Sequence, residues 1–113
     1  MKLNHLNLTV TDVLATHSFL QTYFGLTPLS EADKNMGFLR DDNGMVLSIF
    51  RGKAVHYPKG FHIGFIQPNR ESVDDLNRRL AADGFDVPAP SQQHGSWTFY
   101  FEAPGGFTVE VLS

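Results

Sequence analysis

Polar and apolar residues alternate over residues 3–10 at the start of the chain. Leu8 and Val10 fall on one side of this pattern, whereas His5 and Asn7 fall on the other. Strict alternation is typical of a β-strand with one buried face, because successive side chains of a strand point in opposite directions. The pattern predicts a first strand that presents His5 and Asn7 away from the core.

The next segment, TDVLATHSFLQTYFG, has the spacing of a helix. Val13, Leu20 and Phe24 fall on one helical stripe. Thr11 is a residue type that caps helix N-termini, and Gly25 suits the position just after a helix ends. We expect a helix here, with its apolar stripe packed against the first strand.

Three short strand-like runs follow the helix. They cover residues 27–30, 36–40 and 45–50. The sequence DDNG joins the last two, and Asn-Gly between apolar runs is a strong signal for a tight hairpin turn. The first half of the chain is therefore predicted to run strand, helix and three strands.

The second half repeats this order. GFHIGFIQ alternates like the first strand, and PNRESVDDLNRRLAADG indicates a helix that is capped near Asn69 and ends at Gly84. DVPAP is expected to be a proline-broken strand and SQQHGS a loop. SWTFYFEA and GFTVEVL should form a hairpin around the PGG turn.

When the two halves are aligned, several residues of the same type fall at equivalent positions, and Ser48 falls at the position of Glu110. The matched positions are His5 with His62, Gly25 with Gly84, Gly44 with Gly106, and Ser48 with Glu110. The repeat is visible more in pattern than in identity.

Composition narrows the class of protein. A chain of 113 residues with 42% hydrophobic residues and ten phenylalanines fits one globular domain. A net charge of −3, without a cluster of Lys and Arg, argues against nucleic-acid binding. The absence of cysteine excludes thiolate catalysis, disulfides and cysteine-based zinc sites. No run suits a signal peptide or a membrane span, so a cytoplasmic protein without membrane partners is expected.

Four polar residues fall on the side of their strands that points away from the predicted helices: His5, His62, Ser48 and Glu110. Taken singly, a strand histidine is more often structural, and a glutamate in a terminal strand usually faces solvent. Two imidazoles and one carboxylate at equivalent places of a repeat instead suit Zn, Mn, Fe, Co or Ni. Such a set leaves coordination positions open for water or substrate. We therefore interpret His5, His62 and Glu110 as ligands of a divalent metal ion.

Three segments carry a resemblance to a known family: LNHLNLTVTDVLATHSFLQTYFGL, FHIGFIQ and FYFEAPGGFTVEV. Over nearly its whole length the chain resembles the vicinal oxygen chelate superfamily, which includes glyoxalase I, bleomycin-resistance proteins and extradiol dioxygenases. The resemblance implies an α+β fold, in which two βαβββ modules, residues 1–55 and 59–113, form a curved mixed sheet with helices on its outer face. Together they would make a single glyoxalase-like domain over residues 1–113, and a homodimer is expected.

The metal positions of the family match His5, His62 and Glu110 residue by residue. A fourth position, which is Glu, Gln or His in glyoxalase I and the acyl-CoA epimerases, is Ser48 here. Because serine is a poor ligand for these metals, the set more closely resembles that of extradiol dioxygenases and fosfomycin-resistance thiol transferases. Pro90 stands where the thiol transferases have a lysine, which weighs against a phosphonate substrate.

The resemblance also implies residues that contact substrate. Thr98 and Tyr100 match hydroxyl-bearing pocket positions of the thiol transferases. Asn7 and Ser48 are further candidate substrate-binding residues. Tyr100 and Glu110 are the candidate catalytic residues.

The side to which Tyr100 points depends on the register of the last hairpin. If Tyr100 opposes Thr108, its phenol faces the metal. A shift by one residue would place Phe99 and Phe101 there instead.

Two further histidines allow alternatives. His94, in the predicted loop, is either an acid–base group at the mouth of the pocket or an exposed loop residue. His17, on the first helix near the apolar stripe, is expected to be structural.

The resulting expectation is a metal-dependent enzyme that acts on a small oxygen-chelating molecule. Lyase, isomerase, dioxygenase and thiol-transferase chemistry all stay open. The alternative is a non-catalytic protein that binds a small molecule or antibiotic, as the bleomycin-resistance proteins do. The complete set of three ligands favours the enzyme.

Overall fold

The computed structural model describes all residues 1–113, and the chain divides into two compact units. The first unit contains 1–57 and the turn 104–106, and the second contains 58–103 and 107–113. The elements of the first are β1 (His5–Val10), α1 (Val13–Phe24), β2 (Thr27–Pro28), β3 (Met36–Arg40) and β4 (Val46–Arg51). Those of the second are β5 (His62–Ile66), α2 (Arg70–Ala82), β6 (Ser91–Gln93), β7 (Ser96–Ala103) and β8 (Phe107–Leu112).

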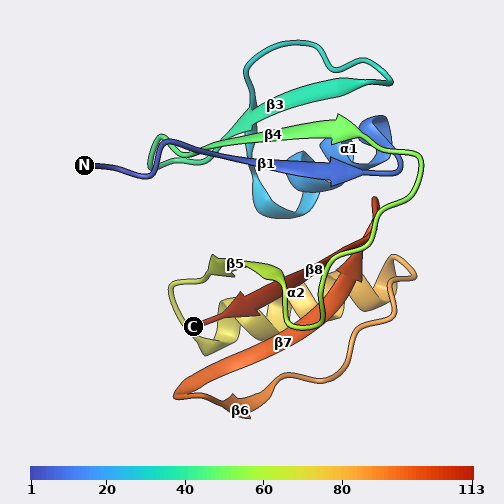
Figure 1. The fold of residues 1–113 in the computed structure, drawn as a ribbon. Helices are drawn as coiled ribbons and strands as arrows, with labels where there is room; N and C mark the ends of the chain where they lie inside the picture. The colour runs from blue at the N-terminus through green and yellow to red at the C-terminus, as the bar shows by residue number, and fades with distance from the viewer. The chain divides into compact units, whose positions relative to one another are not determined.

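The first unit is a four-stranded mixed sheet with α1 against one face (Figure 1). The strand order is β1-β4-β3-β2, with β1 parallel to β4 and the remaining pairs antiparallel. The core between helix and sheet consists of fully buried aliphatic side chains: Leu8, Val10, Val13, Leu20, Leu39 and Ile49. The opposite face of β1 therefore carries the polar residues of the alternating pattern, as predicted.

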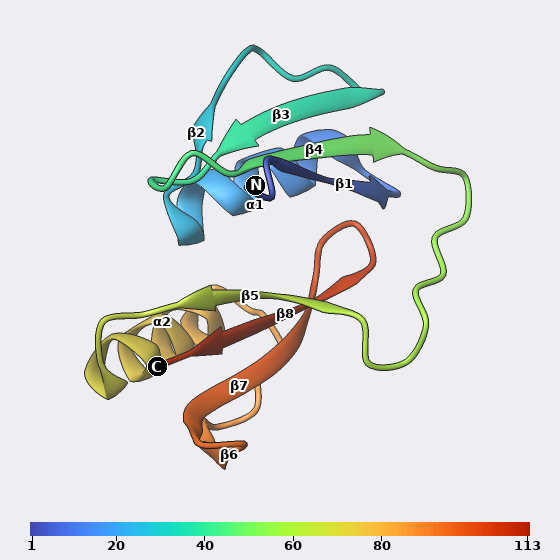
Figure 2. The ribbon, with the colours of Figure 1, turned by 60° about the vertical axis from the view of Figure 1, so that its left-hand side comes forward.

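The second unit repeats this plan with α2 against one face of its sheet (Figure 2). The strand order is β5-β8-β7-β6, and β5 is parallel to β8. Its core is also apolar: Val73, Leu80, Phe99, Phe101, Phe107, Val109 and Val111. The predicted α+β class and the order βαβββ, used twice, are confirmed.

The strand register supports the repeat seen in the sequence. Asn7 pairs with Ser48 between β1 and β4, and Gly64 pairs with Glu110 between β5 and β8. Ser48 and Glu110 therefore occupy equivalent places in their sheets.

The helix ends agree only partly with the sequence prediction. Asp12 and not Thr11 caps α1, and its Oδ1 accepts a hydrogen bond of 3.0 Å from the backbone of Ala15. Asn69 caps α2 as predicted, through its contact with the backbone of Ser72. Gly25 follows α1 in the left-handed conformation, as predicted for this glycine.

Two predicted strands are wrong in extent or place. β2 contains only Thr27–Pro28, and DVPAP forms no strand. Pro88 and Pro90 lack the N–H that a strand ladder needs, which disfavours pairing there. The polar segment that was expected to be a loop instead supplies β6, which pairs with β7 from Ser91 to Gln93.

The turn between β7 and β8 packs within the first unit. The backbone N–H of Thr11 donates to the carbonyl of Gly105 at 3.1 Å, and the Thr16 hydroxyl lies 3.1 Å from the carbonyl of Pro104.

Neither α1 nor α2 has the length and apolar character needed to cross a bilayer.

Candidate functional site

The candidate residues of the second unit gather on the sheet face that α2 leaves uncovered. Tyr100 is the direct cross-strand partner of Glu110, whereas Thr108 pairs with Glu102. The observed register differs by two residues from the pairing of Tyr100 with Thr108. An even shift preserves the face, so Tyr100 and Glu110 lie on the same side of the hairpin.

His62 and Glu110 form the centre of this group. The Nε2 atom of His62 lies 3.2 Å from Oε2 of Glu110, and the side chains are 37% and 13% exposed. The Nδ1 atom of His62 lies 2.8 Å from the carbonyl oxygen of Gly60. Because a carbonyl only accepts, Nδ1 carries the hydrogen and Nε2 is the atom that faces the carboxylate.

Glu110 also contacts the hydroxyl of Thr98 on β7. Oγ1 of Thr98 lies 2.9 Å from Oε1 of Glu110 and 2.9 Å from the backbone carbonyl of Val111. Thr98 is fully buried. The two carboxylate oxygens of Glu110 therefore have different partners. Oε1 contacts the buried hydroxyl of Thr98, and Oε2 faces the partly exposed ring of His62.

Tyr100 lies beside the same pair. Its ring centroid is 5.2 Å from that of His62, and the rings meet edge to face. Burial raises the pKa of Tyr100, and hydrogen bonding to Glu110 and the charge of that carboxylate raise it further. The phenol is therefore a hydrogen-bond donor at neutral pH.

The candidate residues of the first unit are arranged differently. His5 is exposed at the start of β1, with Nδ1 3.1 Å from the Asn4 side-chain oxygen. An oxygen acceptor thus occupies Nδ1 of both histidines and leaves Nε2 for other partners. Ser48 is buried, and its hydroxyl oxygen accepts a 2.7 Å hydrogen bond from the amide of Asn7.

The structure brings His62, Glu110, Thr98 and Tyr100 together in the second unit, and Asn7 and Ser48 together in the first. Within either unit by itself, no group of three His, Asp or Glu side chains surrounds one point. His94 lies in the turn between β6 and β7, and not in a long loop.

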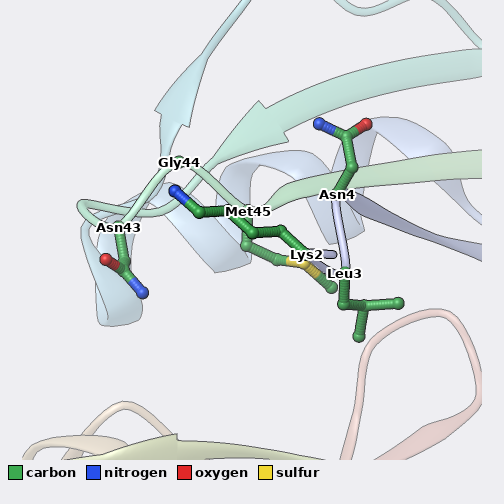
Figure 3. Close-up of a pocket in the computed structure, with 6 residues that line it drawn as sticks. All are labelled: Lys2, Leu3, Asn4, Asn43, Gly44 and Met45. Atoms are coloured by element: carbon green, nitrogen blue, oxygen red, sulfur yellow. The ribbon is translucent and has the colours of Figure 1, made fainter.

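A hollow of about 540 Å³ lies beside the N-terminal segment of the first unit (Figure 3). It is lined by Lys2, Leu3, Asn4, Asn43, Gly44 and Met45. None of the candidate residues lines it, and it offers amides and one ammonium group rather than metal ligands. The candidate chemistry therefore belongs to the sheet faces and not to this hollow.

Two features of the site escaped the sequence prediction. The carbonyl of Gly60 fixes the hydrogen of His62, and a backbone atom has no signature in the sequence. Gly64, the partner of Glu110, is the other: a Cβ built there would lie 3.7 Å from Oε2 of Glu110. When the two repeats are aligned, Gly64 takes the position of Asn7, and this match was the available signal in the sequence.

Fold and site together define an α+β protein of two βαβββ units, with a His–Glu pair on an open sheet face. Residues 2–111 match the Glyoxalase/Bleomycin resistance protein/Dioxygenase superfamily, and the chain belongs to this family. The resemblance seen in the sequence is thereby confirmed.

Solved structures of the family are similar to the chain over its length. A possible glyoxalase from Bacillus cereus shares 50% identity with a TM-score of 0.93, over 100% of this chain and 99% of that one. The fosfomycin resistance protein FosX from Listeria monocytogenes shares 24% identity with a TM-score of 0.83, over 99% and 92%. A lactoylglutathione lyase from Agrobacterium tumefaciens shares 20% identity with a TM-score of 0.78, over 98% and 92%; the last two likenesses show the fold. No curated protein matches the chain.

Proposed function

We propose that this protein is a divalent-metal-dependent enzyme that acts on a small molecule with adjacent oxygen atoms. His62 and Glu110 hold the metal ion, and His5 supplies the third ligand. Asn7, Ser48 and Tyr100 contact the bound molecule. The candidate metals are Zn, Mn, Fe, Co and Ni, which imidazole and carboxylate together suit.

The contact between His62 and Glu110 is the observation that carries the proposal. With Nδ1 donating to Gly60, a neutral His62 directs the Nε2 lone pair toward a carboxylate oxygen 3.2 Å away. Two acceptors at this distance repel unless a cation lies between them. Two metal bonds of about 2.1 Å that open at a tetrahedral or octahedral angle place their ligand atoms about 3.0–3.4 Å apart. The pair therefore fits a metal ion as well as a shared proton.

The surroundings of the pair also resemble a metal centre. Metal-bound histidines usually donate their other ring N–H to a carbonyl or carboxylate, as His62 does to Gly60. A structure of the E126Q mutant of Listeria FosX, 23% identical to this chain, was solved with Mn(II) and a dihydroxypropylphosphonic acid. That protein shares the fold, so the fold can accommodate such an ion.

A bound cation would supply Lewis-acid stabilisation of negative charge on a substrate oxygen. The residues of the chain perform the remaining tasks. Tyr100 offers a phenolic O–H beside the His62–Glu110 pair, and Gly64 leaves the approach to Glu110 free of a side chain.

Metal content tests the proposal directly. Purified protein should carry about one transition metal ion per chain by elemental analysis, as three protein ligands imply. Glu110→Gln should lose most of it, because the amide keeps the shape of the side chain and removes its charge. Glu102→Gln is the matched control, since Glu102 is an exposed carboxylate on β7 opposite Thr108. Wild-type protein that binds none of the five metals would refute the metal-dependent function.

The role of His5 needs a separate experiment, because His5 belongs to the other unit. His5→Ala should lower the metal content as Glu110→Gln does. If two copies of the chain share each site, co-refolding His5→Ala with Glu110→Gln restores one intact site per mixed dimer. If each chain holds its own site, the mixture stays empty. Full metal binding by His5→Ala alone would remove His5 from the ligand set.

The reaction class follows from assays of the metal-loaded protein with hemithioacetal, catechol and fosfomycin substrates. Glu110→Gln should abolish whichever activity is found. A protein that binds metal and small ligands but turns over no substrate would instead be a binding protein.

A further inference from the structure

The geometry around Glu110 points to a role for Thr98 that the sequence resemblance did not imply. We propose that Thr98 is a positioning residue for the Glu110 carboxylate and not a contact for the substrate. The inference rests on the proposed metal site and adds the residue that orients its carboxylate ligand.

Burial gives the first step. Thr98 has no exposed surface, and its hydroxyl contacts Oε1 of Glu110 and the carbonyl of Val111, each at 2.9 Å. A hydroxyl has one hydrogen to donate, and both neighbours are acceptors. Donation to the carboxylate is favoured, because hydrogen bonds to charged groups are stronger than those to neutral ones. The hydrogen is therefore used inside the sheet and is not available to a ligand on its surface.

The two oxygens of Glu110 give the second step. Thr98 holds Oε1, whereas Oε2 lies 3.2 Å from Nε2 of His62. A carboxylate held at one oxygen cannot turn freely, so the other oxygen stays directed at the histidine. Holding ligand atoms in place before the ion arrives increases metal affinity.

The first repeat lacks this arrangement. Met36 occupies the position equivalent to Thr98, since Met36 pairs with Phe50 as Thr98 pairs with Leu112. At the position equivalent to Glu110, Ser48 is held by the amide of Asn7 instead. At the position of Thr98, a buried hydroxyl is thus present only in the repeat that contains the carboxylate.

Three variants at position 98 test the inference, with Mn²⁺ alone as the probe in isothermal titration calorimetry. Thr98→Val keeps the shape and removes the hydroxyl, and should weaken Mn²⁺ binding about 10–100-fold. Thr98→Ser keeps the hydroxyl and should bind Mn²⁺ within about threefold of wild type, because the weaker binding of Thr98→Val is expected to come from the missing hydroxyl. Thr98→Ala replaces Thr98→Val if the valine variant does not fold.

The control is Thr108→Val, which removes a hydroxyl from the residue paired with His62. It should bind Mn²⁺ like wild type. If folded Thr98→Val also binds Mn²⁺ like wild type, the positioning role is refuted while the metal site stands.

A crystal structure of metal-free Thr98→Val separates this inference from the proposed function. Without the hydroxyl, Glu110 should move its Oε2 away from Nε2 of His62. If the carboxylate stays in place, the inference is refuted, whatever wild-type protein binds. If wild type binds no metal but the carboxylate moves, the proposed function fails and the positioning role remains.

Discussion

The side-chain amide nitrogen of Gln21 lies 2.8 Å from Nδ1 of His17, one turn earlier in α1. An amide nitrogen only donates, so Nδ1 accepts and Nε2 carries the hydrogen. Nε2 is buried and has no hydrogen-bond partner. His17 is therefore held in its neutral form, and burial lowers its pKa below the ordinary value of 6.5.

This arrangement predicts that stability depends on His17 at mildly acidic pH. The unfolded chain binds a proton at the ordinary pKa of 6.5, whereas the folded chain binds it only at lower pH. The contribution of neutral His17 is therefore complete above pH 6.5 and is lost as the pH falls from there through the folded-state pKa. Melting temperatures measured from about one pH unit above the ordinary histidine pKa to about two units below it should decline toward acid.

His17→Gln cannot be protonated and should flatten this decline, even if it is less stable at neutral pH. His56→Gln is the control, because His56 is exposed and its loss leaves His17 in place. An equal acid-dependent decline in wild type and His17→Gln would contradict the prediction.

The turn between β7 and β8 predicts a large effect at Gly105 and a smaller one at Gly106. Both have positive φ, at 98° and 93°. A Cβ on Gly105 would also overlap the Thr16 hydroxyl and lie 3.0 Å from Cβ of Val10, whereas one on Gly106 would lie 3.8 Å from Val55. Gly106→Ala should cost about 1 kcal/mol from backbone strain, and Gly105→Ala about 3 kcal/mol, because the contacts add to the strain.

Denaturant titration of both glycine variants measures these differences in the free energy of unfolding. Equal costs at the two positions would mean that the turn does not pack tightly against Thr16. The comparison needs no assumption about activity.

The sequence predicted those features that follow from local periodicity. Alternation placed His62 and Glu110 on the face opposite the helix, and the repeat correctly matched Ser48 to Glu110. These predictions hold because a strand buries one face and exposes the other, whatever else the chain does.

Features that depend on distant partners could not be predicted. β6 has no apolar pattern, and it is a strand because Ser91 pairs with Thr98 on β7. Two of the groups that hydrogen-bond to the His62–Glu110 pair are the backbone carbonyl of Gly60 and the Thr98 hydroxyl on another strand. Neither contact follows from local spacing.

The residue that caps the N-terminus of α1 was predicted wrongly from local propensity, and the observed cap leads to a stability prediction. Thr11 and Asp12 are both good capping types, so sequence alone does not choose between them. In the structure, Asp12 accepts from Ala15, while the backbone of Thr11 is bonded to Gly105. Asp12→Ala should lower the free energy of unfolding by about 1 kcal/mol, whereas Thr11→Ala should change it by less than about 0.5 kcal/mol. Urea denaturation of the two variants gives the comparison, and the reverse order would restore Thr11 as the cap.

The turn between β6 and β7 predicts a stabilising substitution. Gln93 pairs with Ser96, so His94 and Gly95 form a two-residue loop, and their φ angles are 51° and 81°. Positive φ at both positions is the hairpin geometry that favours Asn-Gly, and His94 is the only non-glycine residue of the chain with positive φ. His94→Asn should raise stability by about 0.5–1 kcal/mol, because asparagine tolerates this conformation better. His94→Val should lower stability by a similar or larger amount, since a β-branched side chain is strained there. Thermal unfolding of the two variants in parallel tests both signs, and a valine variant as stable as the asparagine variant would show that the turn is not held in this conformation.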